Sequence, residues 1–153
     1  MLTMGRLVAA VFWAGLGHAA GRLVLEGLPP ELPAGRMPAV TAAIGSAVAW
    51  KFAGPFSIRA AGLQVNRAEA ISFGFQTSFL LWLSSLAFHA GAKMIDKALD
   101  KRYGSDVLLA LTDIFALMWK FARYTLRLDV MALLILGGVI GGLLVEAISR
   151  RWQ

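Results

Sequence analysis

The chain has 153 residues, of which 58% are apolar and only 16% are charged. A soluble domain holds about 45–50% apolar residues, so this composition, with a mean hydropathy of +0.67, predicts an all-α integral membrane protein. The absence of cysteine excludes disulfides, thiolate catalysis and cysteine-ligated metals. The net charge of +6 is typical of loops that meet anionic lipid, and no nucleic-acid partner is expected.

A helix needs about 20 mostly apolar residues to cross the hydrocarbon core of a bilayer. Four segments meet or approach that length, and we expect them to form one helical domain with four transmembrane helices, at about 7–25, 37–53, 68–91 and 128–148. The first segment has no cleavage motif after it and is expected to be retained. Three prolines after it predict a tight hairpin to the second segment, and Gly54-Pro55 predicts a loop after the second. Four spans would put both termini on the same side.

The third span is expected to continue as a charged, solvated helix through "KMIDKALDKR", residues 93–102. The sequence Tyr103-Gly104-Ser105 should end this helix, because glycine and serine favour turns. Ser105 or Asp106 is then the expected N-cap of another helix.

That helix, at about 106–126, is predicted to be an amphipathic interfacial helix between the third and fourth spans. Asp106, Asp113, Lys120 and Arg127 lie seven residues apart and form a narrow polar stripe, while the remaining face is apolar. Such a helix typically lies in the plane of the membrane interface. A fifth span is the alternative, but it would bury Asp113 and Lys120 at a cost of several kcal/mol each.

The stretch "HAAGRLVLE" places three ionisable side chains inside the first span. His18, Arg22 and Glu26 are spaced by four residues and share one helical face. One interpretation is an interfacial anchor in which Arg22 reaches outward and pairs with Glu26. The other is an anion or proton site, with Arg22 as the fixed charge and His18 as the titratable group.

Ser85 and His89 are four residues apart in the third span. Polar residues in such a position usually hydrogen-bond across helices or to their own backbone. The sharper hypothesis is a polar path that Ser85 and His89 share with His18. No metal site and no cofactor are predicted from these residues.

The fourth span contains "GGVIGG", in which Gly137 and Gly141, and likewise Gly138 and Gly142, are four residues apart. This doubled small-residue pattern lets helix backbones approach closely. The partner helix could belong to this chain, to a second copy or to a subunit of a larger membrane complex. Further on, Glu146 and Arg150 have the spacing of an intrahelical ion pair.

Signatures of catalysis are missing from the sequence. It has no Gly-x-Ser-x-Gly motif, no P-loop, no His-Glu-x-x-His motif and no dinucleotide fingerprint. Nothing pairs a nucleophile with an oriented base, so a non-enzymatic protein is expected.

Four stretches resemble the TrgA family of small bacterial inner-membrane proteins. They are "LVAAVFWAGLG", "VTAAIGSAVAWKFAGP", "DKRYGSDVLLALTDIFALMWKFARY" and "LGGVIGGLLVEAISRRW", and they follow one another along nearly the whole chain. The family is common in alphaproteobacteria and is named for an association with tellurite resistance. The resemblance implies a multi-pass protein of the inner membrane but no catalytic or binding residue.

Three functions therefore stand as expectations. The first is a non-enzymatic protein of this type that acts by helix packing or binding in the lipid bilayer. The second is an accessory subunit of a larger photosynthetic or respiratory membrane complex. The third is a small oxyanion or proton transporter built on Arg22 and His18; a chain without cysteine cannot reduce tellurite by its own thiols.

Overall fold

The computed structural model describes residues 3–29, 35–62, 64–100, 104 and 106–152. Within these residues the regular structure is entirely helical, which confirms the all-α class. The helices are α1 (Met4–Gly27), α2 (Met37–Ala61), α3 (Arg67–Leu99), α4 (Val107–Thr125) and α5 (Leu128–Arg151).

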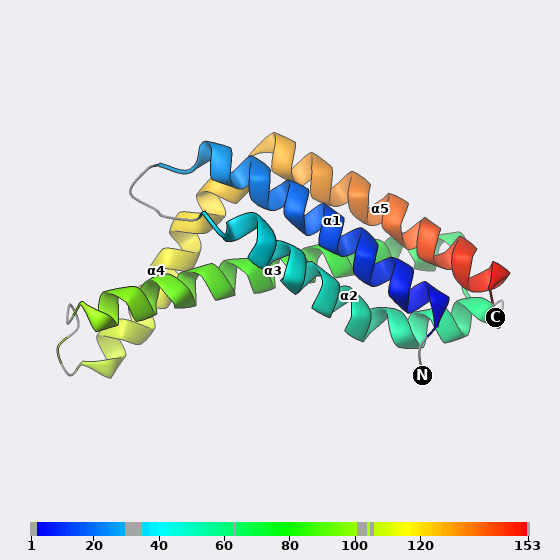
Figure 1. Ribbon diagram of the computed structural model, residues 1–153, viewed down its shortest axis with the longest axis horizontal. Helices are drawn as coiled ribbons and strands as arrows, with labels where there is room; N and C mark the ends of the chain where they lie inside the picture. The colour runs from blue at the N-terminus through cyan, green and yellow to red at the C-terminus, as the bar shows by residue number, and fades with distance from the viewer. Residues whose placement is uncertain (1–2, 30–34, 63, 101–103, 105, 153) are drawn as a thin grey trace.

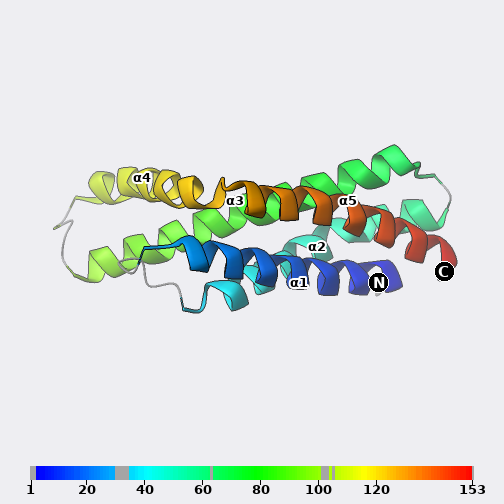
Figure 2. The ribbon, with the colours of Figure 1, turned by 90° about the horizontal axis from the view of Figure 1, so that it is seen from above.

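Four of the helices lie lengthwise beside one another, and the fifth runs obliquely at one end (Figure 1). α1 and α2 form the most extensive helix pair and run antiparallel, so the predicted hairpin is confirmed, although loop residues 30–34 lie outside the described part. α3 continues past the other helices, and α4 returns along it to the start of α5 (Figures 1 and 2). The two ends of the chain lie at the same end of the bundle (Figure 1).

Among the described residues, three helices are long and apolar enough to cross a membrane: α1, α3 and α5. The expectation of four such segments was wrong for the second one, 37–53, which lies in α2. This helix is rich in alanine, glycine and serine and carries Lys51 in its middle, and it does not meet the length and apolarity that α1, α3 and α5 meet.

α2 is also longer than expected, because Pro55 lies inside it and does not end it. Proline removes one backbone hydrogen bond and strains the preceding turn. The turns on both sides of Pro55 are held by packing, since Ala53, Phe56 and Ala60 are buried. Tertiary contacts thus carry the helix to Ala61, where the Gly-Pro pattern alone predicted a loop.

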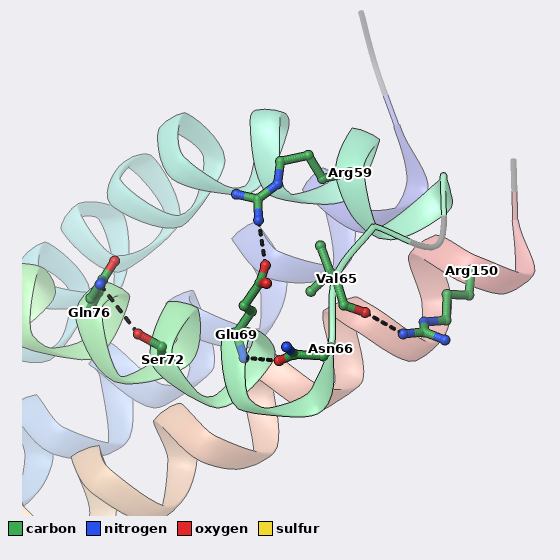
Figure 3. Close-up of polar contacts among 7 residues, drawn as sticks. All are labelled: Arg59, Val65, Asn66, Glu69, Ser72, Gln76 and Arg150. Atoms are coloured by element: carbon green, nitrogen blue, oxygen red, sulfur yellow. Dashed lines mark hydrogen bonds and ion pairs between the residues drawn. The ribbon is translucent and has the colours of Figure 1, made fainter.

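Side chains at the helix starts satisfy backbone groups that would otherwise lack partners. Thr3 accepts a hydrogen bond from the Arg6 N–H, and Asp106 accepts one from the Leu109 N–H at 3.1 Å. The N-cap prediction for Asp106 is therefore confirmed; its alternative, Ser105, lies outside the described residues. Asn66 caps α3 in the same way through the Glu69 N–H at 2.8 Å (Figure 3).

The predicted extension of the third span is confirmed as far as Leu99, and it packs against α4. Lys97 and Asp113 form an ion pair of 2.7 Å across the two helices. Nearer the bundle, the Trp82 indole N–H donates to the Thr125 hydroxyl at 2.9 Å. These two links hold α4 against α3, one within the bundle and one on the projecting part of α3.

Candidate functional site

The predicted polar site divides into two parts that face different surroundings. His18, Arg22 and Glu26 lie on the outward face of α1, and all three are exposed. Within the described part of the chain, no ion pair joins Arg22 to Glu26. Because this face points away from the core, the three residues do not enclose a binding site by themselves.

Ser85 and His89, by contrast, face the interior. They line a cavity of about 30 Å³ to which all five helices contribute residues. Thr41 of α2 lies within reach of this cavity, with its hydroxyl oxygen 3.4 Å from His89 Nε2. The Phe121 ring of α4 lies beside the imidazole, with ring centroids 6.3 Å apart. The sequence did not indicate that Thr41 would join Ser85 and His89.

The cavity is lined mostly by apolar side chains, with Thr41, Ser85 and His89 among its few polar residues. The Ser85 hydroxyl is buried without a hydrogen-bond partner, whereas the Thr41 hydroxyl donates to its own helix at the Met37 carbonyl, 2.8 Å away. A cavity needs about 10–15 Å³ to hold one water molecule. The cavity beside Ser85 and His89 is therefore large enough for a water molecule and too small for a substrate of ordinary size.

Metal binding has little support in the described part of the chain. No group of three or more His, Asp or Glu side chains lies close enough together there to hold an ion. His18 is exposed on α1, while His89 faces the cavity. The two histidines therefore do not form the shared polar path that the sequence raised as a hypothesis.

The glycines of α5 face two different helices of the same chain. A Cβ atom at Gly142 would overlap the carbonyl oxygen of Ala70, and one at Gly138 would lie 2.9 Å from the carbonyl oxygen of Gly74. Gly74 of α3 is equally close to α5, because a Cβ atom added at Gly74 would overlap the Gly138 carbonyl oxygen. The α3 and α5 backbones therefore touch along this row.

The second glycine row of α5 packs against α1. A Cβ atom at Gly141 would lie 2.7 Å from the Trp13 ring, and one at Gly137 would overlap the Leu16 side chain. Of the open alternatives for the helix partner, the internal one applies to both rows. The doubled glycine pattern is used inside the chain and leaves no free glycine face on α5.

Sequence reasoning missed a comparable contact between α1 and α2. A Cβ atom at Gly17 would lie 3.0 Å from the backbone carbonyl carbon of Thr41, and one at Gly21 would lie 2.7 Å from Pro38 Cα. The signal was present, because Gly17 and Gly21 have the same spacing of four as the α5 glycines.

Comparison of this chain with protein-family models, with curated proteins and with solved structures finds no match. The resemblance to the TrgA family therefore rests on the sequence stretches quoted above.

Proposed function

We propose that this chain is a non-enzymatic, multi-pass protein of the bacterial inner membrane, of the tellurite-resistance-associated type, that acts by helix packing or binding within the bilayer. The observation that carries this proposal is the closure of the bundle on itself. Both glycine rows of α5 are occupied by α3 and α1, and the central cavity is only about 30 Å³. Such an interior is suited to a rigid scaffold, because close backbone packing resists opening.

We further propose that α2 crosses the membrane together with α1, α3 and α5. α3 begins at the end of the bundle where α1 also begins (Figure 1). If α1 and α3 both cross, α2 must return the chain across the bilayer between them. Its modest apolarity is tolerable because Thr41, Gly45 and Ala49 are buried against other helices and do not meet lipid.

The course of α4 fits a helix in the membrane interface better than a fifth crossing. α3 ends beyond the end of the bundle at which α5 begins, and α4 runs back between these two points, so α4 need not cross (Figure 1). Asp113 of α4 is paired with Lys97, which lies on the part of α3 that projects beyond the other helices. A crossing helix would hold this ion pair inside the hydrocarbon at a high desolvation cost.

A second candidate function is that of an accessory subunit of a larger membrane complex. α4 supports it, because its outer face carries large apolar side chains that no described part of the chain covers. Val107 is 81% exposed and Phe115 is 69% exposed. The glycine pattern of α5 no longer favours this function, because its partners are internal.

The oxyanion or proton transporter has weaker support. Its two key residues, Arg22 and His18, lie on the outer face of α1, and the cavity at His89 is separate from them. A transporter needs a site that is reachable from both sides through the protein. We therefore place this alternative third.

The native mass of the tagged protein in a mild detergent tests these functions. We expect a particle of one or a few copies, since the bundle closes within one chain. A particle of hundreds of kilodaltons with pigment- or haem-binding subunits would instead favour the accessory subunit.

The associated phenotype has its own test. Deletion of the gene should lower tellurite tolerance, and both the wild-type chain and the Arg22→Gln variant should restore it. A deletion strain with unchanged tolerance would remove the tellurite assignment. If Arg22→Gln alone failed to restore tolerance at normal protein levels, the transporter would become the favoured function.

A further inference from the structure

The outer face of α1 carries a regular stripe of exposed residues, which consists of Val11, Gly15, His18, Arg22 and Glu26. The first four are spaced by four, three and four residues, and this alternation is the pattern along which two helices pack side by side. A Cβ atom added at Gly15 would meet nothing within 4 Å. The stripe is therefore open to another molecule.

Two ionisable side chains of this face lie at membrane depth. α1 has 24 residues and is about 36 Å long, so it is only slightly longer than a hydrocarbon core of about 30 Å. His18 lies about 14 Å from the end of α1 at Gly27, and Arg22 lies about 8 Å from it. Ionisable groups at such depths almost always face protein or water, because contact with lipid is costly. The long Arg22 side chain can extend to the interface, whereas the shorter imidazole cannot.

The described part of the chain supplies no partner for these polar groups. Within it, the side chains of His18, Arg22 and Glu26 have neither a hydrogen bond nor an ion pair. Arg22 precedes Glu26 by one turn, and this order of cation before acid is the weaker one for a pair within one helix. A partner from outside the chain would satisfy all three groups.

We propose that the outer face of α1 packs against the same face of a second copy, so that two chains form a dimer in the membrane. Copies inserted in the same orientation are related by a two-fold axis perpendicular to the bilayer, which places their α1 helices parallel and identical faces together. Gly15 then allows the two backbones to approach closely. This inference rests on the crossing of α1, which is part of the proposed function.

The polar groups of this face are complementary to themselves. A neutral imidazole has one donor and one acceptor, so the His18 side chains of two copies can hydrogen-bond to each other across the axis. Arg22 of each copy can reach Glu26 of the other, which gives two equivalent ion pairs. A different membrane protein would have to supply matching groups of its own. We assign a second copy because this face already carries both members of each polar pair.

Disulfide cross-linking in native membranes locates the interface, because the chain has no cysteine of its own. Val11→Cys lies on the outer face of α1 and should give a covalent dimer of the full chain under mild oxidation. Phe79→Cys is the matched control, since Phe79 is also exposed but lies on α3, which has little contact with α1.

Energy transfer between full chains labelled at the C-terminus measures the dissociation constant in lipid vesicles. Gly15→Leu should weaken the dimer about tenfold by holding the two backbones apart, and it should leave the single chain folded because the space beside Gly15 is empty. Arg22→Gln should weaken it about sevenfold, the effect of losing two interhelical polar contacts of average strength. Exchange of the charges, Arg22→Glu with Glu26→Arg, should restore most of the affinity. Arg36→Gln, at an exposed cation before α2, should have no effect.

A chain that stays monomeric in vesicles would overturn the dimer. Cross-linking of Phe79→Cys as fast as that of Val11→Cys, or an unchanged dissociation constant in Gly15→Leu, would do the same. A different protein cross-linked to Val11→Cys in place of a second copy would assign the face to that protein and overturn this inference too. All these outcomes leave the proposed membrane function in place, whereas a chain that leaves the membrane without detergent would contradict that function.

Discussion

At the scale of single residues, the buried hydroxyls of α3 differ in whether they have a hydrogen-bond partner. Ser78 accepts a hydrogen bond from the fully buried Trp13 indole at 3.1 Å. Ser85, seven residues further along, has a buried hydroxyl without a partner. Removing a bonded partner leaves a donor unsatisfied, whereas removing an unbonded hydroxyl does not.

We therefore predict opposite effects for two alanine substitutions in the same helix. Ser78→Ala should destabilise the protein by about 1–3 kcal/mol, because the Trp13 N–H loses its acceptor. Ser85→Ala should be neutral or slightly stabilising. Denaturation in mixed micelles, followed by tryptophan fluorescence, measures both. A large loss in Ser85→Ala would show that its hydroxyl is bonded, with a bound water as the simplest partner.

Two glycines of α3 provide a second comparison. A Cβ atom at Gly74 would overlap the α5 backbone, whereas one at Gly91 would meet nothing within 4 Å. Gly74→Ala should therefore lower the thermal midpoint, with a cost of about 1–3 kcal/mol for overpacking. Gly91→Ala should raise it slightly, since alanine favours a helix over glycine by about 1 kcal/mol. Equal midpoints would mean that α3 and α5 are further apart than described.

At the scale of elements, the two faces of α4 have different surroundings. Its inner face packs through Leu117 and Phe121 into the bundle, while its outer face exposes Phe115 and Trp119. Lys120 lies on the same helix and is also exposed. An apolar outer face bordered by a cation is typical of a helix that lies half-immersed at the interface.

Spin labels on single cysteines test this placement, and the chain has no native cysteine to interfere. At Phe115→Cys we expect greater accessibility to oxygen, which concentrates in the hydrocarbon, than to a water-soluble nickel complex. At Lys120→Cys the order should be reversed. Water-like accessibility at both positions would mean that α4 lies off the membrane, and lipid-like accessibility at both would favour a fifth span.

At the scale of the whole molecule, the main prediction concerns α2, the one long helix of the bundle proper that is not apolar enough to span by composition. Arg36 and Gln64 flank its two ends. Single cysteines at these positions are treated in intact cells with a membrane-impermeant maleimide. Only one of the two should react, because the reagent reaches only the outer side of the membrane. Trp152→Cys should react like Gln64→Cys, because the C-terminal end of α5 lies near the α2–α3 connection, where Arg150 donates to the Val65 carbonyl (Figure 3). Equal labelling of Arg36→Cys and Gln64→Cys in intact cells would mean that both lie on one side and that α2 does not cross.

Local signals in the sequence were sufficient for several features. The apolar lengths of the first, third and fourth expected spans led to helices α1, α3 and α5. The N-cap at Asp106 was visible because a short acidic side chain precedes an apolar run. The ion pair of Glu146 and Arg150, now seen at 2.6 Å, follows from their spacing of four on one helix. Each of these depends on residues that are close together in the chain.

Other features depended on contacts between distant parts of the chain. Pro55 does not end α2, because neighbouring helices bury the turns around it. His89 meets Thr41, which lies 48 residues away, and not His18. The direction in which an exposed face such as that of His18 and Arg22 points cannot be read from spacing alone. Spacing fixes which residues share a face, but packing decides what that face meets.

The sequence by itself determined that this is a cysteine-free, helical chain with at least three segments suited to a bilayer, because composition and apolar length act locally. Only the tertiary structure decided that the α5 glycines pack within the chain and that Ser85 and His89 face a small cavity between the helices. These features require backbones to meet across tens of residues, and helix periodicity carries no record of which helices become neighbours.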